Sequence, residues 1–200
     1  MTQSPLLPAR IAGFTLVAVA ATQVLFMALS GTLVSFEAQI YWTVESLLYL
    51  AMATSALLLA MRAGAVQAAA VAIALGALCN VIQLVIGLAM FAPLADAGED
   101  YRPVYDAVHA GAFAFYFAGK VLFGAAAVAL GLALAARGGA ARLAGGALGL
   151  AGLAALAVNV AALAVGESLA LPAGATGTLA ALGAGLALTP MVRGSTASRD

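Results

Sequence analysis

Residues Ala107–Ala136 read AVHAGAFAFYFAGKVLFGAAAVALGLALAA, an almost wholly apolar stretch with one fixed charge, Lys120, near its middle. A helix that rises about 1.5 Å per residue crosses a hydrocarbon layer of about 30 Å in about 20 residues, so this stretch predicts a membrane-spanning helix. Lys120 stands 13 residues from Ala107 and 16 from Ala136, too deep to reach either surface easily. A charge at that depth costs about 2.5 kcal/mol or more, so it should face protein or water rather than lipid.

The composition of the whole chain is that of a membrane protein. The 200 residues are 65% hydrophobic and 8% charged, with a mean hydropathy of +1.11. A soluble domain of this size could not bury so much apolar surface. The net charge is zero and no basic residues cluster, which argues against a nucleic-acid partner. The single cysteine, Cys79, lies within an apolar run and cannot form an internal disulfide.

Hydrophobic runs divide the chain into six segments, which predict an all-α membrane protein, a six-transmembrane-helix bundle. The expected spans are Ile11–Gly31, Tyr41–Met61, Ala65–Ala92, Ala107–Ala136, Leu143–Val165 and Ala175–Thr189. The first run is longer than the roughly 7–15 apolar residues of a signal peptide and lacks a clear cleavage site, so we expect it to be an uncleaved span. One six-span domain over residues 1–190 and a polar cytoplasmic tail over residues 191–200 are therefore predicted.

The arginines predict how the spans are oriented. With six spans, one side carries six of the seven basic residues outside the spans, and the other side carries only Arg102. The six are Arg10, Arg62, Arg137, Arg142, Arg193 and Arg199. Basic residues favour the cytoplasmic side of a membrane, so both termini are expected to be cytoplasmic and the acidic loop Asp96–Asp106 outside. The expected location is the bacterial inner membrane.

The charged stretch carries a face of polar and aromatic residues. His109, Phe113, Tyr116 and Lys120 follow at i, i+4, i+7 and i+11, which aligns them on one side of a helix. Glu45 is the only carboxylate within a span, so it is the best candidate counter-ion for Lys120. Their expected depths differ by about two turns. The reach of the lysine, or a water molecule, would have to close that gap.

Amides on other spans admit two interpretations. Asn80 and Gln83 lie on one face of the third span, where they either line a cavity or join helices by hydrogen bonds. For Gln23 and Asn159 the helix-joining interpretation is preferred. The polar residues fall mainly in the outer half of the expected bilayer, which predicts an outward-facing cavity. Its candidate ligand-binding residues are Lys120, Tyr116, Asn80, Gln83, Glu45 and His109.

The last two spans consist almost entirely of small and aliphatic residues. Glycines and alanines recur at a spacing of four, as at Gly145 and Gly149, or at Gly177, Ala181 and Gly185. Such faces let helix backbones approach closely. Packing within one bundle is the preferred interpretation, and a face for a second copy or another membrane protein is the alternative.

The single histidine excludes several chemistries. A haem held by two histidines, or a zinc hydrolase site rich in histidine, needs more than His109 alone. An intramembrane serine protease would need a serine in a glycine-rich setting that faces a histidine, and Ser30 and Ser168 stand in other contexts. A retinal Schiff base on Lys120 is disfavoured because retinal proteins have seven spans. No cofactor, metal site or catalytic set can be assigned, so the sequence favours a protein that is not an enzyme.

Two segments resemble a family of proteins. The chain is similar to a bacterial family of six-helix integral membrane proteins in RIAGFTLVAVA at Arg10–Ala20. It is also similar in LALAARGGAARLAGGALGLAGL at Leu132–Leu153, where a basic turn precedes a Leu- and Gly-rich helix. The family has no established activity, so the resemblance implies topology alone and assigns no functional residue.

Three functional hypotheses follow from these patterns. The leading one is a multi-pass inner-membrane protein that is not an enzyme and that binds a small or amphipathic molecule in the cavity around Lys120. The second is a proton- or ion-coupled transporter of a small solute that uses Glu45 and Lys120. The third is a structural subunit of a larger membrane assembly. The lipid bilayer is the one partner that the sequence itself demands.

Overall fold

The long elements of the protein are all helices. The computed structural model describes residues 5–29, 35–62 and 64–197, and no strand occurs among them. The long helices are α1 (Leu6–Leu29), α2 (Ser35–Ala60), α3 (Gln67–Ile86), α5 (Arg102–Ala135), α6 (Gly139–Val165) and α7 (Ala170–Ala197). Shorter turns are η1 (Gly64–Val66), η2 (Gly87–Phe91), α4 (Ala92–Asp96), η3 (Glu99–Tyr101) and η4 (Glu167–Leu169).

The predicted number of spans agrees with the number of long apolar helices in the structure. Within the described residues, six helices are long and apolar enough to cross a membrane. The third of them continues beyond the expected end, because Pro93 falls in the first turn of α4, where a proline costs no hydrogen bond. The wide turn η2 precedes it. Helix α7 is longer at both ends than expected, and it extends to Ala197.

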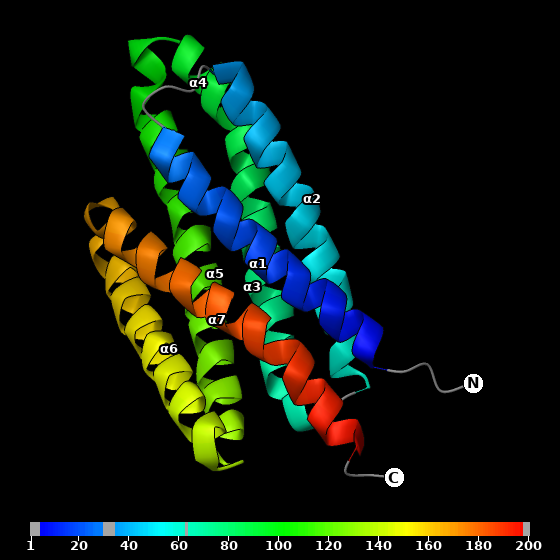
Figure 1. Cartoon of the computed structure of the whole chain (residues 1–200). Helices are drawn as coiled ribbons and strands as arrows, with labels where there is room; N and C mark the ends of the chain where they lie inside the picture. Colours follow the sequence, from blue (N-terminus) through cyan, green and yellow to red (C-terminus); the bar gives the residue numbers. More distant parts are fainter. Residues whose placement is uncertain (1–4, 30–34, 63, 198–200) are drawn as a thin grey trace.

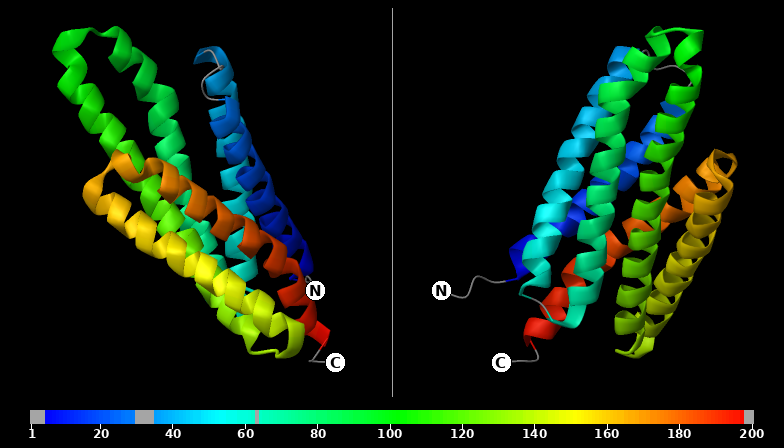
Figure 2. Two further views of the ribbon diagram at one scale, coloured as in Figure 1. Left: turned by 60° about the vertical axis from the view of Figure 1, so that its left-hand side comes forward. Right: turned by 180° about the vertical axis from the view of Figure 1, so that it is seen from behind.

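Five of the long helices close a ring, and α6 lies outside it. Helix α1 packs between α2 and α7, while α3 joins α2 to α5, and α5 meets α7. Figure 2 shows α6 at the margin of the bundle, beside α5 and α7. The start of α1 and the end of α7 lie at one end of the bundle, and α4 lies at the other (Figure 1). We refer to these as the terminal end and the α4 end.

Glycines permit the closest helix contacts, as the spacing of small residues predicts. A Cβ atom on Gly145 of α6 would come within 2.5 Å of the carbonyl oxygen of Gly131 on α5. A Cβ on Gly185 of α7 would lie 2.8 Å from the carbonyl oxygen of Gly13 on α1. Neither neighbour is a flexible side chain, so only glycine fits. These faces are used for packing inside the bundle, which was the preferred interpretation.

The half of the bundle at the terminal end has an apolar core. Its large side chains that are completely buried include Leu16, Met52, Leu59, Ile73, Leu130 and Leu188. The buried polar side chains described in that half are Thr15 and Ser55. Their hydroxyl groups donate to carbonyls three and four residues earlier in their own helices. This core therefore offers no polar path, and the remaining buried polar groups lie nearer the α4 end.

Candidate binding cavity

A cavity of about 580 Å³ is lined by residues of α1, α2, α3, η2, α5 and α7. Its walls come from the half of the bundle at the α4 end, which was expected to be the polar half. Aromatic side chains supply much of the lining: Phe26, Trp42, Phe91, Tyr105, Phe113 and Tyr116. The polar side chains in the lining are Gln23, Glu45, Gln83 and His109. Pockets of this size hold small organic ligands.

The aromatic wall is a continuous series of ring contacts. On α5, the rings of His109 and Phe113 have centroids 5.0 Å apart, and Phe113 meets Tyr116 edge-on at 6.0 Å. Phe91 lies 5.1 Å from His109 and links this row to Trp42, at 6.0 Å. The predicted alignment of these α5 residues on one face is therefore confirmed. Such contacts fix ring orientation, so the wall is preformed.

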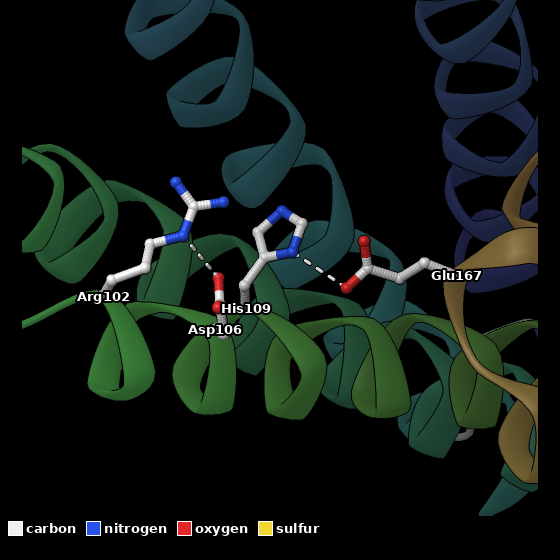
Figure 3. A network of polar contacts seen from close by, with 4 residues as sticks. All are labelled: Arg102, Asp106, His109 and Glu167. Atoms are coloured by element: carbon white, nitrogen blue, oxygen red, sulfur yellow. Dashed lines mark hydrogen bonds and ion pairs between the residues drawn. The ribbon is translucent and has the colours of Figure 1, made fainter. Parts of the chain in front are cut away.

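A hydrogen bond between a histidine and a glutamate lies at the rim of the cavity. The Nδ1 atom of His109 lies 2.8 Å from Oε1 of Glu167 (Figure 3). Because Glu167 belongs to η4, this contact joins α5 to the turn between α6 and α7. Earlier on α5, Arg102 donates from Nε to Asp106 at 3.0 Å. The His109–Glu167 pair is partly exposed, and the Arg102–Asp106 pair is more exposed. His109 belongs to the cavity lining, whereas Arg102 and Asp106 do not.

Lys120 lies beneath the cavity rather than in its wall. Its side chain is completely buried, and Nζ donates to Oε1 of Gln23 at 2.5 Å. Thr178 Oγ1 lies 3.5 Å from Nζ and donates to the same oxygen of Gln23 at 2.7 Å. The Nε2 of Gln23 donates to the hydroxyl of Tyr49 at 2.8 Å. We call these four residues the Lys120 network, which connects α5, α1, α7 and α2.

Tyr116 and Gln23 separate Lys120 from the cavity. The ammonium lies 5.1 Å from the centroid of the Tyr116 ring, close enough for a cation–π contact. Both Tyr116 and Gln23 line the cavity, whereas Lys120 does not. The expectation that Lys120 faces protein rather than lipid is confirmed. The geometry does not favour Lys120 as a residue that contacts a ligand directly. Lys120 instead supports Tyr116 and Gln23, which form the floor of the cavity.

Glu45, the candidate counter-ion of Lys120, does not form a direct ion pair with it, and the two charges influence each other over a longer distance. Among the described residues, neither forms a salt bridge within 4.0 Å. Glu45 instead accepts a hydrogen bond from Thr22 at 2.7 Å. The reason is that Glu45 and Lys120 lie at different depths in the bundle. On α2, Tyr49 is the residue that contacts Gln23 of the Lys120 network, and Glu45 lies one turn away from Tyr49. Thr22 and Gln23 are neighbours in α1, so the carboxyl and the ammonium bind adjacent residues rather than each other.

Asn80 and Gln83 have different surroundings. Gln83 lines the cavity. Asn80 is completely buried at the crossing of α3 and α5, where Nδ2 donates to the carbonyl of Gly76 at 2.8 Å and packs against Gly119. Asn159 donates to Ala173, which joins α6 to α7 as expected. The sequence therefore placed one of the pair correctly in the cavity wall, and the other belongs to helix packing.

Two residues of the Lys120 network were not predicted from the sequence. Gln23 was interpreted as joining helices, which it does, but it also lines the cavity. Thr178 carried no signal, since threonine in a helix usually bonds a carbonyl of its own turn. Trp42 was not among the predicted cavity residues, yet it lies in the cavity wall.

A second hollow of about 790 Å³ lies on the flank between α1 and α7. Its lining is apolar except for Thr178, and Met27 lines both hollows. The hydrogen bond between Gln23 and Thr178 therefore runs between the two spaces, because each residue lines one of them.

Neither a metal centre nor a known relative explains the cavity. Among the described residues, no group of three or more His, Cys, Asp or Glu side chains could hold a metal ion. Compared with models of protein families, with curated proteins and with solved structures, the chain matches none.

Proposed function

We propose that this protein spans the inner membrane six times and binds an amphipathic molecule in its outward-facing cavity, without catalysing a reaction. The distribution of arginines supports the orientation, with both termini cytoplasmic and the loop from Asp96 to Asp106 outside. In the structure, Arg137 of the turn between α5 and α6 donates to the carbonyl of Met191 near the end of α7 at 2.9 Å. The arginine-bearing turn and the end of α7 thus share one end of the bundle.

The single observation that carries the proposal is the make-up of the cavity. Aromatic rings form its walls, while Gln23, Glu45 and Gln83 supply polar groups at defined positions. A few convergent polar groups in an aromatic pocket suit a ligand with one polar and one apolar part. The apolar hollow between α1 and α7, which shares Met27 with the cavity, would admit the apolar part from the bilayer.

The two other hypotheses have less support. A transporter needs a path to the cytoplasmic side, but the core below the Lys120 network is apolar among the described residues. Glu45 and Lys120 also do not pair, which weakens a proton-coupling role for them. A structural subunit would predict a stoichiometric protein partner after purification in mild detergent.

Native mass spectrometry of protein released from its own membranes tests the binding function. We expect one small molecule bound per chain. Gln83→Trp should remove it, because the indole would fill the cavity. Val85→Trp is the matched control, since Val85 lies on the same helix but is 52% exposed on the outer surface. Retention of the molecule by Gln83→Trp would refute binding in this cavity.

Cysteine accessibility tests the outward opening independently. With Cys79 replaced by serine, Gln83→Cys should react with an impermeant thiol reagent added from outside. Ala77→Cys, which is completely buried on the same helix, should not react. An unreactive Gln83→Cys in folded protein would contradict an outward-facing cavity.

A further inference from the structure

We propose that the ligand is an amphipathic organic cation whose positively charged head lies against Glu45. This inference rests on the proposed function and specifies the chemical class of the ligand. It starts from the charges that line the cavity. Glu45 is the carboxylate in that lining, and neither lysine nor arginine is found there. An anionic head group would therefore meet a carboxylate and no fixed positive charge.

Glu45 is buried without a direct ion pair, and Lys120, on the far side of Gln23, acts on it only from a longer distance. Its side chain is 6% exposed, and one of its oxygens accepts the hydrogen bond of Thr22. Among the described residues, no basic group approaches it within 4.0 Å. A buried carboxylate is costly unless a positive charge compensates it, and a cationic ligand would supply that charge.

The hydrogen-bond donors near the floor are already engaged. The amide of Gln23 donates to Tyr49, and the hydroxyl of Thr22 donates to Glu45. The ammonium of Lys120 donates to Gln23 and is completely buried below the floor. These three groups already have acceptors, and Glu45 is the carboxyl in a lining that otherwise holds the amide of Gln83 and the imidazole of His109 as polar groups.

Aromatic rings near Glu45 suit a cation. Trp42 precedes Glu45 by three residues on α2, so both lie on the same face of the helix. The indole contacts the rings of Phe26 and Phe91, with centroids 6.5 Å and 6.0 Å away. The negative faces of such rings attract ammonium groups, with Trp the strongest. The carboxyl and the three rings together form the proposed head-group site.

The intrinsic fluorescence of Trp42 provides a direct assay, because it is the only tryptophan in the chain. The protein is placed in phosphatidylcholine bilayer discs and titrated with tetraphenylphosphonium or with tetraphenylborate, an anion of similar size and shape. We expect saturable quenching by the cation and none by the anion. Glu45→Gln should weaken the affinity for the cation at least about tenfold. Glu99→Gln removes an exposed carboxylate outside the cavity and should leave that affinity unchanged.

Two results would overturn the inference: tighter binding of tetraphenylborate, or unchanged cation affinity in Glu45→Gln. If Glu45→Gln does not fold, protection of Gln83→Cys decides, since that variant keeps the carboxyl. The cation should slow its reaction with the thiol reagent, and the anion should not. If the cysteine reacts and the cation does not protect it, the proposed cationic ligand is refuted, but the outward-facing cavity is not. A cysteine that never reacts refutes the outward-facing cavity itself.

Discussion

Gln23, rather than Glu45, should be the residue to which Lys120 is energetically coupled. The structure predicts this from contacts, since Nζ of Lys120 lies 2.5 Å from Oε1 of Gln23 but forms no salt bridge with Glu45. Two double-mutant cycles separate the alternatives. One combines Lys120→Met with Gln23→Leu, and the other combines Lys120→Met with Glu45→Gln.

The magnitudes follow from what each change leaves behind. Gln23→Leu leaves Lys120 with the Thr178 oxygen, at 3.5 Å, as its hydrogen-bond acceptor beside the Tyr116 ring, and hydrogen bonds to charged groups contribute about 1.5–3 kcal/mol. In the Lys120→Met background, Gln23→Leu removes only the hydrogen bonds of Gln23 to Tyr49 and Thr178, each of which contributes about 0.6 kcal/mol to stability within a membrane. Because those bonds are lost in both backgrounds, they cancel, and we expect a coupling of about 1.5–3 kcal/mol between Lys120 and Gln23. The coupling with Glu45 should stay below about 0.5 kcal/mol.

Equilibrium unfolding in mixed micelles measures both cycles. The protein is titrated with sodium dodecyl sulfate, and helix content is followed by circular dichroism for each single and double variant. Additive losses for Lys120 and Gln23 would refute the hydrogen bond as an energetic contact. A larger coupling between Lys120 and Glu45 would show that the two charges interact through the intervening residues, and the proposed cation site would then lose its unpaired carboxylate.

Three further predictions test packing, orientation and the rim. Gly145→Ala should destabilise the protein by about 1–3 kcal/mol because its Cβ meets α5 backbone, whereas Gly146→Ala, which meets nothing within 4 Å, should stabilise it by up to about 1 kcal/mol in the same unfolding assay. Cysteines at Ala95 and Ala140, in a chain whose native cysteine is replaced by serine, should label from opposite sides of the membrane; labelling of both from outside would overturn the orientation. Glu167→Gln should change the unfolding free energy by less than about 1 kcal/mol, since this ion pair is partly exposed, and a larger loss would mean that the rim is structural.

The sequence predicted the helices well because a membrane span is a local property. About 20 apolar residues in succession are enough to identify one, whatever their neighbours in space. The alignment of His109, Phe113 and Tyr116 was also predictable, since helical periodicity alone places them on one face. The same holds for the small-residue face around Gly145, although its partner Gly131 could not be named in advance.

The contacts between helices were not predictable in the same way. The choice of Glu45 as the partner of Lys120 followed from charge, but hydrogen-bond partners depend on depth and on which helices adjoin. Helix α1 lies between α2 and α7, so Gln23 and Thr178 meet at the level of the ammonium. Neither residue carries a charge that would have pointed to the other. The ring order of the helices is a tertiary property, and it decided which interpretation of each polar residue was correct.

Gly177 shows how the bundle accommodates a lysine at this depth. A Cβ atom on Gly177 would come within 2.5 Å of Cδ of Lys120, so α7 carries a glycine where the lysine side chain passes. The side chain is thereby held against α7, with its ammonium between Gln23 and the face of Tyr116. Because both of these residues line the cavity, a shift of Lys120 would move the cavity floor. This arrangement favours Lys120 as a positioning residue, whose loss should alter ligand affinity through Tyr116 and Gln23 rather than through a direct contact.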